Sequence, residues 1–277
     1  MAVSGSVDRD GFALDFVREG SGIPMLILGS PPYYQRAFPA DLQGHFDVVF
    51  GNLRVFTSAP DGFDVTSLTR ESYSDDIEAI RQATGLPKCI VVGHSIAALV
   101  ALEYARRYPD SVQGVAMVGT PPIGFNDAPP VIAAFFDKDA DAERRAAHER
   151  NLATRHAPAT FESGQDIVDF YIANGALYWR DPTFDATWLW EGTRFDFDVL
   201  NHLNGVLYGQ YHLEPLDVPM FLGLGRYDYV VPYYLWDEPR NRLSRLHYEL
   251  FDQSGHTPQY EEPQRFTEAI TSWAQSL

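Results

Sequence analysis

The sequence has only one cysteine, Cys89, so it cannot form an internal disulfide bond. Because Cys89 begins the apolar run Cys89–Val92, we expect it to be a small buried side chain. The sequence also lacks an apolar run of about 18 residues, the length that a membrane-spanning helix needs. No basic segment leads into an apolar stretch at the N-terminus, so we expect no signal peptide and a cytoplasmic protein.

Basic residues are scarce: 21 Lys and Arg stand against 38 Asp and Glu, which gives a net charge of −17. A surface this negative repels phosphate backbones and anionic lipid headgroups, so neither nucleic acid nor a membrane is an expected partner. The simplest interpretation is that the charge keeps the protein soluble. The alternative is that part of it lies in a substrate pocket and favours a cationic ligand.

The motifs that bind nucleotide cofactors are absent, because neither G-x-G-x-x-G nor G-K-[ST] occurs. His148-Glu149 does not begin an H-E-x-x-H zinc motif, since Leu152 occupies the place of the second histidine. We therefore expect no cofactor and no metal. Seven histidines are expected to be surface or satisfied core residues: His45, His94, His148, His156, His202, His212 and His247.

Short apolar runs alternate with helical patterns through the first 120 residues. The apolar runs predict strands over residues 12–17, 24–28, 47–50, 89–92 and 112–118, and helical spacing predicts helices over 69–83 and 95–107. Further strands are predicted over 219–224 and 247–251, followed by a helix over 263–275. This order predicts an α/β fold in which helices flank a mostly parallel central sheet.

The alternation stops at Pro121-Pro122, and the segment 121–214 is helical, rich in aromatic residues and without a clear strand. We therefore predict two parts. Residues 1–120 and 215–277 form the core domain, and residues 121–214 form a helical cap inserted into it.

The strongest local motif is Gly93-His94-Ser95-Ile96-Ala97, which lies between a predicted buried strand and a predicted helix. A sharp strand-to-helix turn exposes a serine hydroxyl to substrate and base, and it needs small residues on both sides. Gly93 and Ala97 supply them, although glycine is more usual than alanine at the second position. The motif predicts that Ser95 is a nucleophile and that the N–H of Ile96 belongs to an oxyanion hole.

Asp228 and His256 occupy the places where the partners of a serine nucleophile belong. Each follows a predicted strand closely, Asp228 after 219–224 and His256 after 247–251. The chain order Ser, Asp, His is the one expected for this kind of strand–turn–helix nucleophile. The alternative, a turn aspartate and a loop histidine, leaves this shared placement unexplained, so we predict a catalytic triad.

The loop after the predicted strand 24–28 should supply the second oxyanion donor. Proline has no N–H, so Ser30 is the best candidate there. Tyr33 and Tyr34 in the same loop, together with Trp236, are predicted to line an apolar acyl or prolyl pocket.

Three segments carry a resemblance to a known family: Gly93–Ala97, Gly225–Pro232 and Ser254–Pro263. They look like an α/β-hydrolase close to the proline iminopeptidase group, and the resemblance spans nearly the whole chain. That group has a Trp-Glu pair in its cap, and its carboxylate binds the free N-terminal amine of the substrate. Trp190-Glu191 matches this pair, so the resemblance implies that both residues bind substrate. The alternative is that Glu191 caps a helix or lies on its surface and does not bind substrate.

Two loops depart from the pattern of that group. Its His-Gly-Gly-Pro segment is replaced by Leu28-Gly29-Ser30-Pro31, and its Asp-x-Arg-Gly segment by Asn52-Leu53-Arg54-Val55-Phe56. The predicted function is a serine hydrolase, similar to the proline iminopeptidases, that acts by acyl-enzyme chemistry on a small ester, lactone or amide, or on a short peptide. The alternatives are a carboxylesterase or lactonase without aminopeptidase activity, and a non-catalytic ligand receptor on the same fold. The sequence does not determine an oligomeric state.

Overall fold

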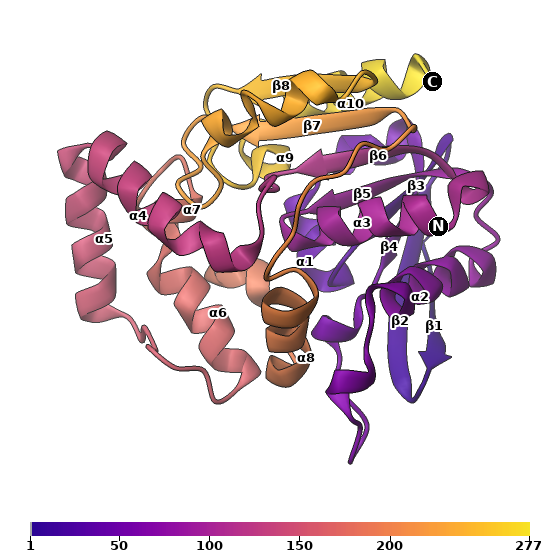
Figure 1. Ribbon diagram of the computed structural model, residues 1–277, viewed down its shortest axis with the longest axis horizontal. Coiled ribbons are helices and arrows are strands. Elements are labelled where there is room, and N and C mark those ends of the chain that lie inside the picture. Colours follow the sequence, from indigo (N-terminus) through magenta and orange to yellow (C-terminus); the bar gives the residue numbers. More distant parts are fainter. Residues whose placement is uncertain (1) are drawn as a thin grey trace.

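The computed structural model describes residues 2–277, and its centre is an eight-stranded sheet (Figure 1). The strands are β1 (Val3–Arg9), β2 (Phe12–Gly20), β3 (Ile23–Leu28), β4 (Phe46–Gly51), β5 (Cys89–His94), β6 (Val112–Val118), β7 (Met220–Gly225) and β8 (Leu246–Phe251). Their spatial order is β1-β2-β4-β3-β5-β6-β7-β8. β2 runs antiparallel to β1 and β4, and every pair from β4 to β8 is parallel.

Helices cover both faces of this sheet. α2 (Arg70–Ala83) and α3 (Ile96–Arg107) pack with one set of strand residues, whereas α1 (Pro31–Ala37) and α10 (Pro263–Gln275) pack with the other. The short helix α9 (Pro258–Glu261) precedes α10. Successive strand residues alternate between the two cores, so that Leu26 packs in the first and Met25 in the second. The predicted mostly parallel α/β sheet is confirmed.

Each strand predicted from the sequence is present, with ends within three residues of the prediction. One of the eight strands, β1, is not predicted from the sequence. Its residues Val3–Arg9 are mostly exposed or half-buried and include serine and glycine, so no apolar run or alternation marks them as a strand. Pairing with β2 along its whole length holds them in the sheet.

The segment 121–214, which we call the helical insert, contains α4 (Ala128–Asp139), α5 (Ala142–Thr154), α6 (Gly164–Ala173), α7 (Gly175–Tyr178) and α8 (Phe197–Asn201). Figure 1 shows α4 and α7 beside the carboxyl ends of β7 and β8. The division into core and cap stays a prediction, which these positions support. Within residues 2–277, no helix is long and apolar enough to cross a membrane.

Candidate active site

Ser95 lies at the turn between β5 and α3, where the backbone bends sharply. Its φ of +56° and ψ of −128° are unusual for a residue with a side chain. The N–H of Ser95 donates to the carbonyl of Val118 on the neighbouring strand (2.8 Å). A Cβ atom at Gly93 would lie 2.3 Å from the carbonyl oxygen of Ala97, so this turn requires glycine there.

Gly93→Ala is expected to destabilise the protein by about 3 kcal/mol or to prevent folding, because the added methyl group meets backbone atoms that cannot rotate away. The free energy of unfolding in urea measures the effect. Gly44→Ala is the matched control, since nothing lies within 4 Å of a Cβ atom at Gly44. Equal stability of the two variants would show that the turn tolerates a side chain.

Asp228 is fully buried and contacts His256 directly. Its Oδ2 lies 2.7 Å from Nδ1 of His256, and its Oδ1 accepts the backbone N–H groups of Val230 (2.9 Å) and Val231 (2.7 Å). Because a carboxylate only accepts hydrogen bonds, Nδ1 of His256 carries the proton and Nε2 is left as an acceptor. His256 and Ser95 line the same cavity, so the structure brings together the three residues predicted as a triad.

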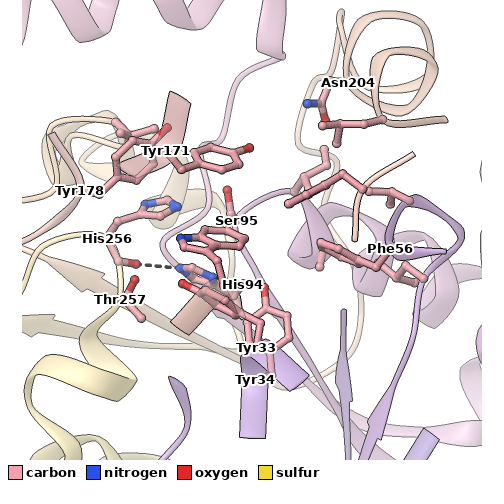
Figure 2. A pocket seen from close by; sticks show the side chains of 18 of the residues that line it. Tyr33, Tyr34, Phe56, His94, Ser95, Tyr171, Tyr178, Asn204, His256 and Thr257 are labelled. Atoms are coloured by element: carbon pink, nitrogen blue, oxygen red, sulfur yellow. Dashed lines mark hydrogen bonds between the residues drawn. The ribbon is translucent and has the colours of Figure 1, made fainter. Parts of the chain in front are cut away.

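The backbone of His256 is held from two sides. Its N–H donates to the carbonyl of Tyr178 at the end of α7 (2.6 Å). Its carbonyl lies 2.8 Å from Nε2 of His94, the contact drawn as a dashed line in Figure 2. The rings of His94 and His256 also lie side by side, with their centroids 4.7 Å apart. His94 therefore ties the strand that carries Ser95 to the loop that carries His256.

The lowered pKa of His94 and its two hydrogen bonds together fix where its proton lies. Burial, and secondly the neighbouring His256, lower the pKa of His94 to about 3, so its imidazole is neutral. A carbonyl cannot donate, so Nε2 of His94 carries the proton, and Nδ1 accepts from the hydroxyl of Tyr34 (3.3 Å). The sequence predicts a surface or satisfied core histidine at His94. It is a buried histidine, and its place beside Ser95 in the motif was the available signal.

His94→Gln is expected to make stability less sensitive to acid. Folding lowers the pKa of His94 from 6.5 to about 3, so the unfolded chain binds more protons in this window. The contribution of His94 to the free energy of unfolding is complete above pH 6.5. It is lost as the pH falls toward 3, at up to about 1.4 kcal/mol per pH unit. Urea unfolding from about pH 4 to 7 measures the slope. His45→Gln, at an exposed position, is the control; a slope unchanged in His94→Gln would contradict the prediction.

The two predicted oxyanion donors lie at helix N-termini. Ile96 is the first residue of α3 and lines the cavity, and its N–H has no acceptor within the helix. Ser30 precedes α1, and its hydroxyl lies 3.2 Å from that of Thr193. Ser30 lines a separate depression next to Asn52, not the cavity that Ser95 lines. The roles of both N–H groups stay predictions.

The cavity beside Ser95 and His256 is walled by aromatic and aliphatic side chains (Figure 2). Tyr33, Tyr34 and Trp190, which the sequence analysis assigned to substrate binding, all line it. Trp190 stacks on Tyr171, with ring centroids 5.2 Å apart and planes 7° apart, and lies 4.3 Å from the ring of Tyr33. The cavity also contacts Leu53, Val55, Phe56, Phe125, Tyr178, Phe195, Leu200 and Val230. Its volume is about 130 Å³, close to the roughly 150 Å³ in which an apolar cavity binds benzene.

The comparisons with known proteins agree with this fold. The family model described as "alpha/beta hydrolase fold" matches residues 22–263, most of the chain. The chain belongs to the α/β-hydrolase fold family. A curated relative, the AB hydrolase superfamily protein YclE of Bacillus subtilis (strain 168), is 30% identical over 278 residues and covers 99% of both chains. The expected membership of the α/β-hydrolase superfamily is thus confirmed.

Solved structures of other α/β-hydrolases share the fold at low identity. A proline iminopeptidase-related protein from Thermus thermophilus is 20% identical, with a TM-score of 0.70 over 100% of this chain and 98% of that one. An epoxide hydrolase from Bacillus megaterium, solved in complex with an inhibitor, is 18% identical, with a TM-score of 0.65 over 98% and 100%. Because these two names describe different reactions, the fold by itself does not select a substrate.

Two predicted substrate residues of this α/β-hydrolase lie outside the cavity. Glu191 is exposed, because the turn Thr187–Trp190 ends just before it and sends the next residue outward. Trp236 is buried in the core, where its indole N–H donates to the carbonyl of Thr120 (2.7 Å). The structure places neither side chain in the lining of this cavity, and their roles in substrate binding stay predictions. Trp236 has its hydrogen bond satisfied by the core and has no free polar group for a ligand.

One group of side chains within residues 2–277 has metal-ligating atoms close together: His156, Asp166 and Asp169. The sequence spacing does not suggest it. Asp166 already accepts the N–H groups of Glu162 (2.9 Å) and Ser163 (2.8 Å) at the start of α6, which explains its position without a metal. We therefore assign no ion to this group.

Proposed function

We propose that this α/β-hydrolase is a serine hydrolase that cleaves small, neutral carboxylic esters or lactones. The observation that carries the proposal is the chemistry of the cavity beside Ser95 and His256. Within the described chain, none of the residues that line this cavity is Asp, Glu, Lys or Arg. A charged ligand would lose its hydration there without gaining a partner of opposite charge, so an uncharged substrate is favoured.

In the proposed reaction Ser95 Oγ attacks the substrate carbonyl carbon while its proton passes to Nε2 of His256. Asp228 holds the imidazole in the required tautomer and stabilises the imidazolium that forms. The N–H groups of Ile96 and Ser30 stabilise the negative charge on the carbonyl oxygen. The C–O bond to the leaving group then breaks, and the alkoxide takes the proton from His256. Water, deprotonated by His256, releases the acid from Ser95 by the reverse steps.

The aminopeptidase alternative depends on a carboxylate that pairs with the free amine of the substrate. In the resemblance this carboxylate is Glu191, which is exposed and outside the cavity. An ammonium group inside the apolar cavity would have no counter-charge, and desolvation of an unpaired charge is costly. The geometry therefore favours an ester or lactone over an N-terminal prolyl substrate.

A small substrate panel tests the proposal: 4-nitrophenyl butyrate, an acyl lactone and the 4-nitroanilide of proline. We expect the ester or the lactone to be hydrolysed and the prolyl anilide to be left intact. Cleavage of the prolyl anilide alone would overturn the proposal in favour of the aminopeptidase. Tight binding of these compounds without turnover would instead indicate a ligand receptor.

A further inference from the structure

Asn204 is a polar residue in an otherwise apolar part of the cavity wall. α8 continues into a π-helical turn, His202–Leu207, and Asn204 lies in this turn. Figure 2 shows Asn204 across the cavity from His256 and Thr257. Within the described residues, its amide oxygen is buried and has no hydrogen-bond partner.

The turn that carries Asn204 is held in place by the core. Nε2 of His202 lies 2.9 Å from the carbonyl of Leu68, and the N–H of Tyr208 donates to the carbonyl of Leu203 (3.0 Å). π-helical turns occur mostly as single insertions in helices and are frequent at functional sites. The position of Asn204 is therefore set by the backbone, and its amide faces a cavity that a ligand can fill.

An unpaired amide oxygen among apolar side chains is unfavourable in the free protein. A buried polar atom without a partner costs the free energy of its lost hydration, and such atoms are uncommon in proteins. Leu200, Phe125 and Phe195 line the cavity with Asn204 and offer it no polar side-chain group. A ligand that hydrogen-bonds to this amide would remove the cost, whereas a wholly apolar ligand would leave it.

We propose that Asn204 is a specificity-determining residue that binds a neutral hydroxyl or amide group of the substrate. The substrate is then an ester or lactone with a compact apolar part, about the size of one ring, that carries such a group away from the reacting carbonyl. The inference rests on the proposed function. The side-chain amide both donates and accepts, so it can bind a hydroxyl in either direction. An ionised group is not expected there, since the lining of the cavity has no charge to pair with it.

Two matched pairs of esters test the proposal, one varied in the acid and one in the alcohol. The first pair is the 4-nitrophenyl esters of 3-phenylpropanoic and 3-(4-hydroxyphenyl)propanoic acid. The second is the acetates of 2-phenylethanol and 2-(4-hydroxyphenyl)ethanol. In at least one pair, we expect kcat/KM to be about tenfold or more higher for the hydroxylated ester. Asn204→Leu, of similar size, should abolish this preference, so that kcat/KM no longer differs between the two esters of that pair.

Asn201→Leu is the matched control, because Asn201 is exposed and does not line the cavity. It should retain the preference of the wild-type protein. Equal kcat/KM values within both pairs for the wild type, or an unchanged preference in Asn204→Leu, would overturn the proposal.

A binding measurement separates this inference from the proposed function. Calorimetry should show that the wild type binds phenol more tightly than benzene and that Asn204→Leu loses the difference. If phenol is preferred but no ester or lactone is hydrolysed, Asn204 keeps its role and the proposed hydrolase activity fails. If esters are hydrolysed but phenol and benzene bind alike in both proteins, the role of Asn204 fails and the activity stands.

Discussion

Ser95→Ala is expected to lower kcat for ester hydrolysis by about 10⁴- to 10⁶-fold, because no acyl-enzyme can form without the hydroxyl. The remaining turnover would come from polarisation of the carbonyl and from substrate binding. Steady-state hydrolysis of 4-nitrophenyl butyrate measures the loss. Covalent labelling by a fluorophosphonate should disappear in the same variant, which links the loss of activity to this residue.

Ser67→Ala is the control for Ser95→Ala, since Ser67 is exposed and does not line the cavity. It should keep full activity. Ser95→Gly should be inactive but more stable than the wild type by about 1 kcal/mol, because glycine relieves the cost of a φ of +56°. Near-normal hydrolysis by Ser95→Ala would refute Ser95 as the nucleophile.

Asp228→Asn is expected to lower kcat by about 10⁴-fold through the tautomer of His256. The N–H groups of Val230 and Val231 both donate to Oδ1 of Asp228, so an asparagine must keep its oxygen on that side. Its NH₂ group then faces Nδ1 of His256, where Oδ2 now lies at 2.7 Å. Since Nδ1 must then accept, the proton moves to Nε2, and His256 can no longer take a proton from Ser95.

The tautomer of His256 and a surface variant separate this effect from misfolding. Asp217→Asn is the control, because the Asp217 side chain is 96% exposed. It should leave kcat unchanged. Nuclear magnetic resonance of the imidazole nitrogens should show the Nδ1–H form in the wild type and the Nε2–H form in Asp228→Asn. Retention of the Nδ1–H form with full activity would contradict the role assigned to Asp228.

The sheet could be predicted from the sequence because its inner strands are short, mostly buried and mostly apolar. The turn at Ser95 could also be predicted from the sequence, because close backbone contact makes glycine necessary at position 93. Strand β1 could not be read in this way, since pairing with β2 stabilises it and its own composition does not. The apolar composition of a strand therefore made it predictable, whereas a strand held mainly by its pairing with a neighbour was not.

The walls of the cavity were harder to predict, because they depend on contacts between distant segments. Trp190 faces the cavity whereas its neighbour Glu191 faces away, because the helical turn Thr187–Trp190 ends between them. Trp236 was taken for a pocket residue because aromatic residues serve both cores and pockets, and a core partner satisfies its N–H. Asn204 carries no motif, and only the folded chain shows that its amide oxygen is left without a partner among the described residues.

The attachment of the helical insert to His256 limits how the molecule can open. Besides the bond from the His256 N–H to Tyr178, the buried Arg144 of α5 donates to the carbonyls of Ala176, Trp179 and Arg180 and so locks this segment to its helix. Any movement that lifts the segment off the core would also withdraw the imidazole from Ser95. We therefore expect substrates that are too large to enter without this movement to be hydrolysed slowly.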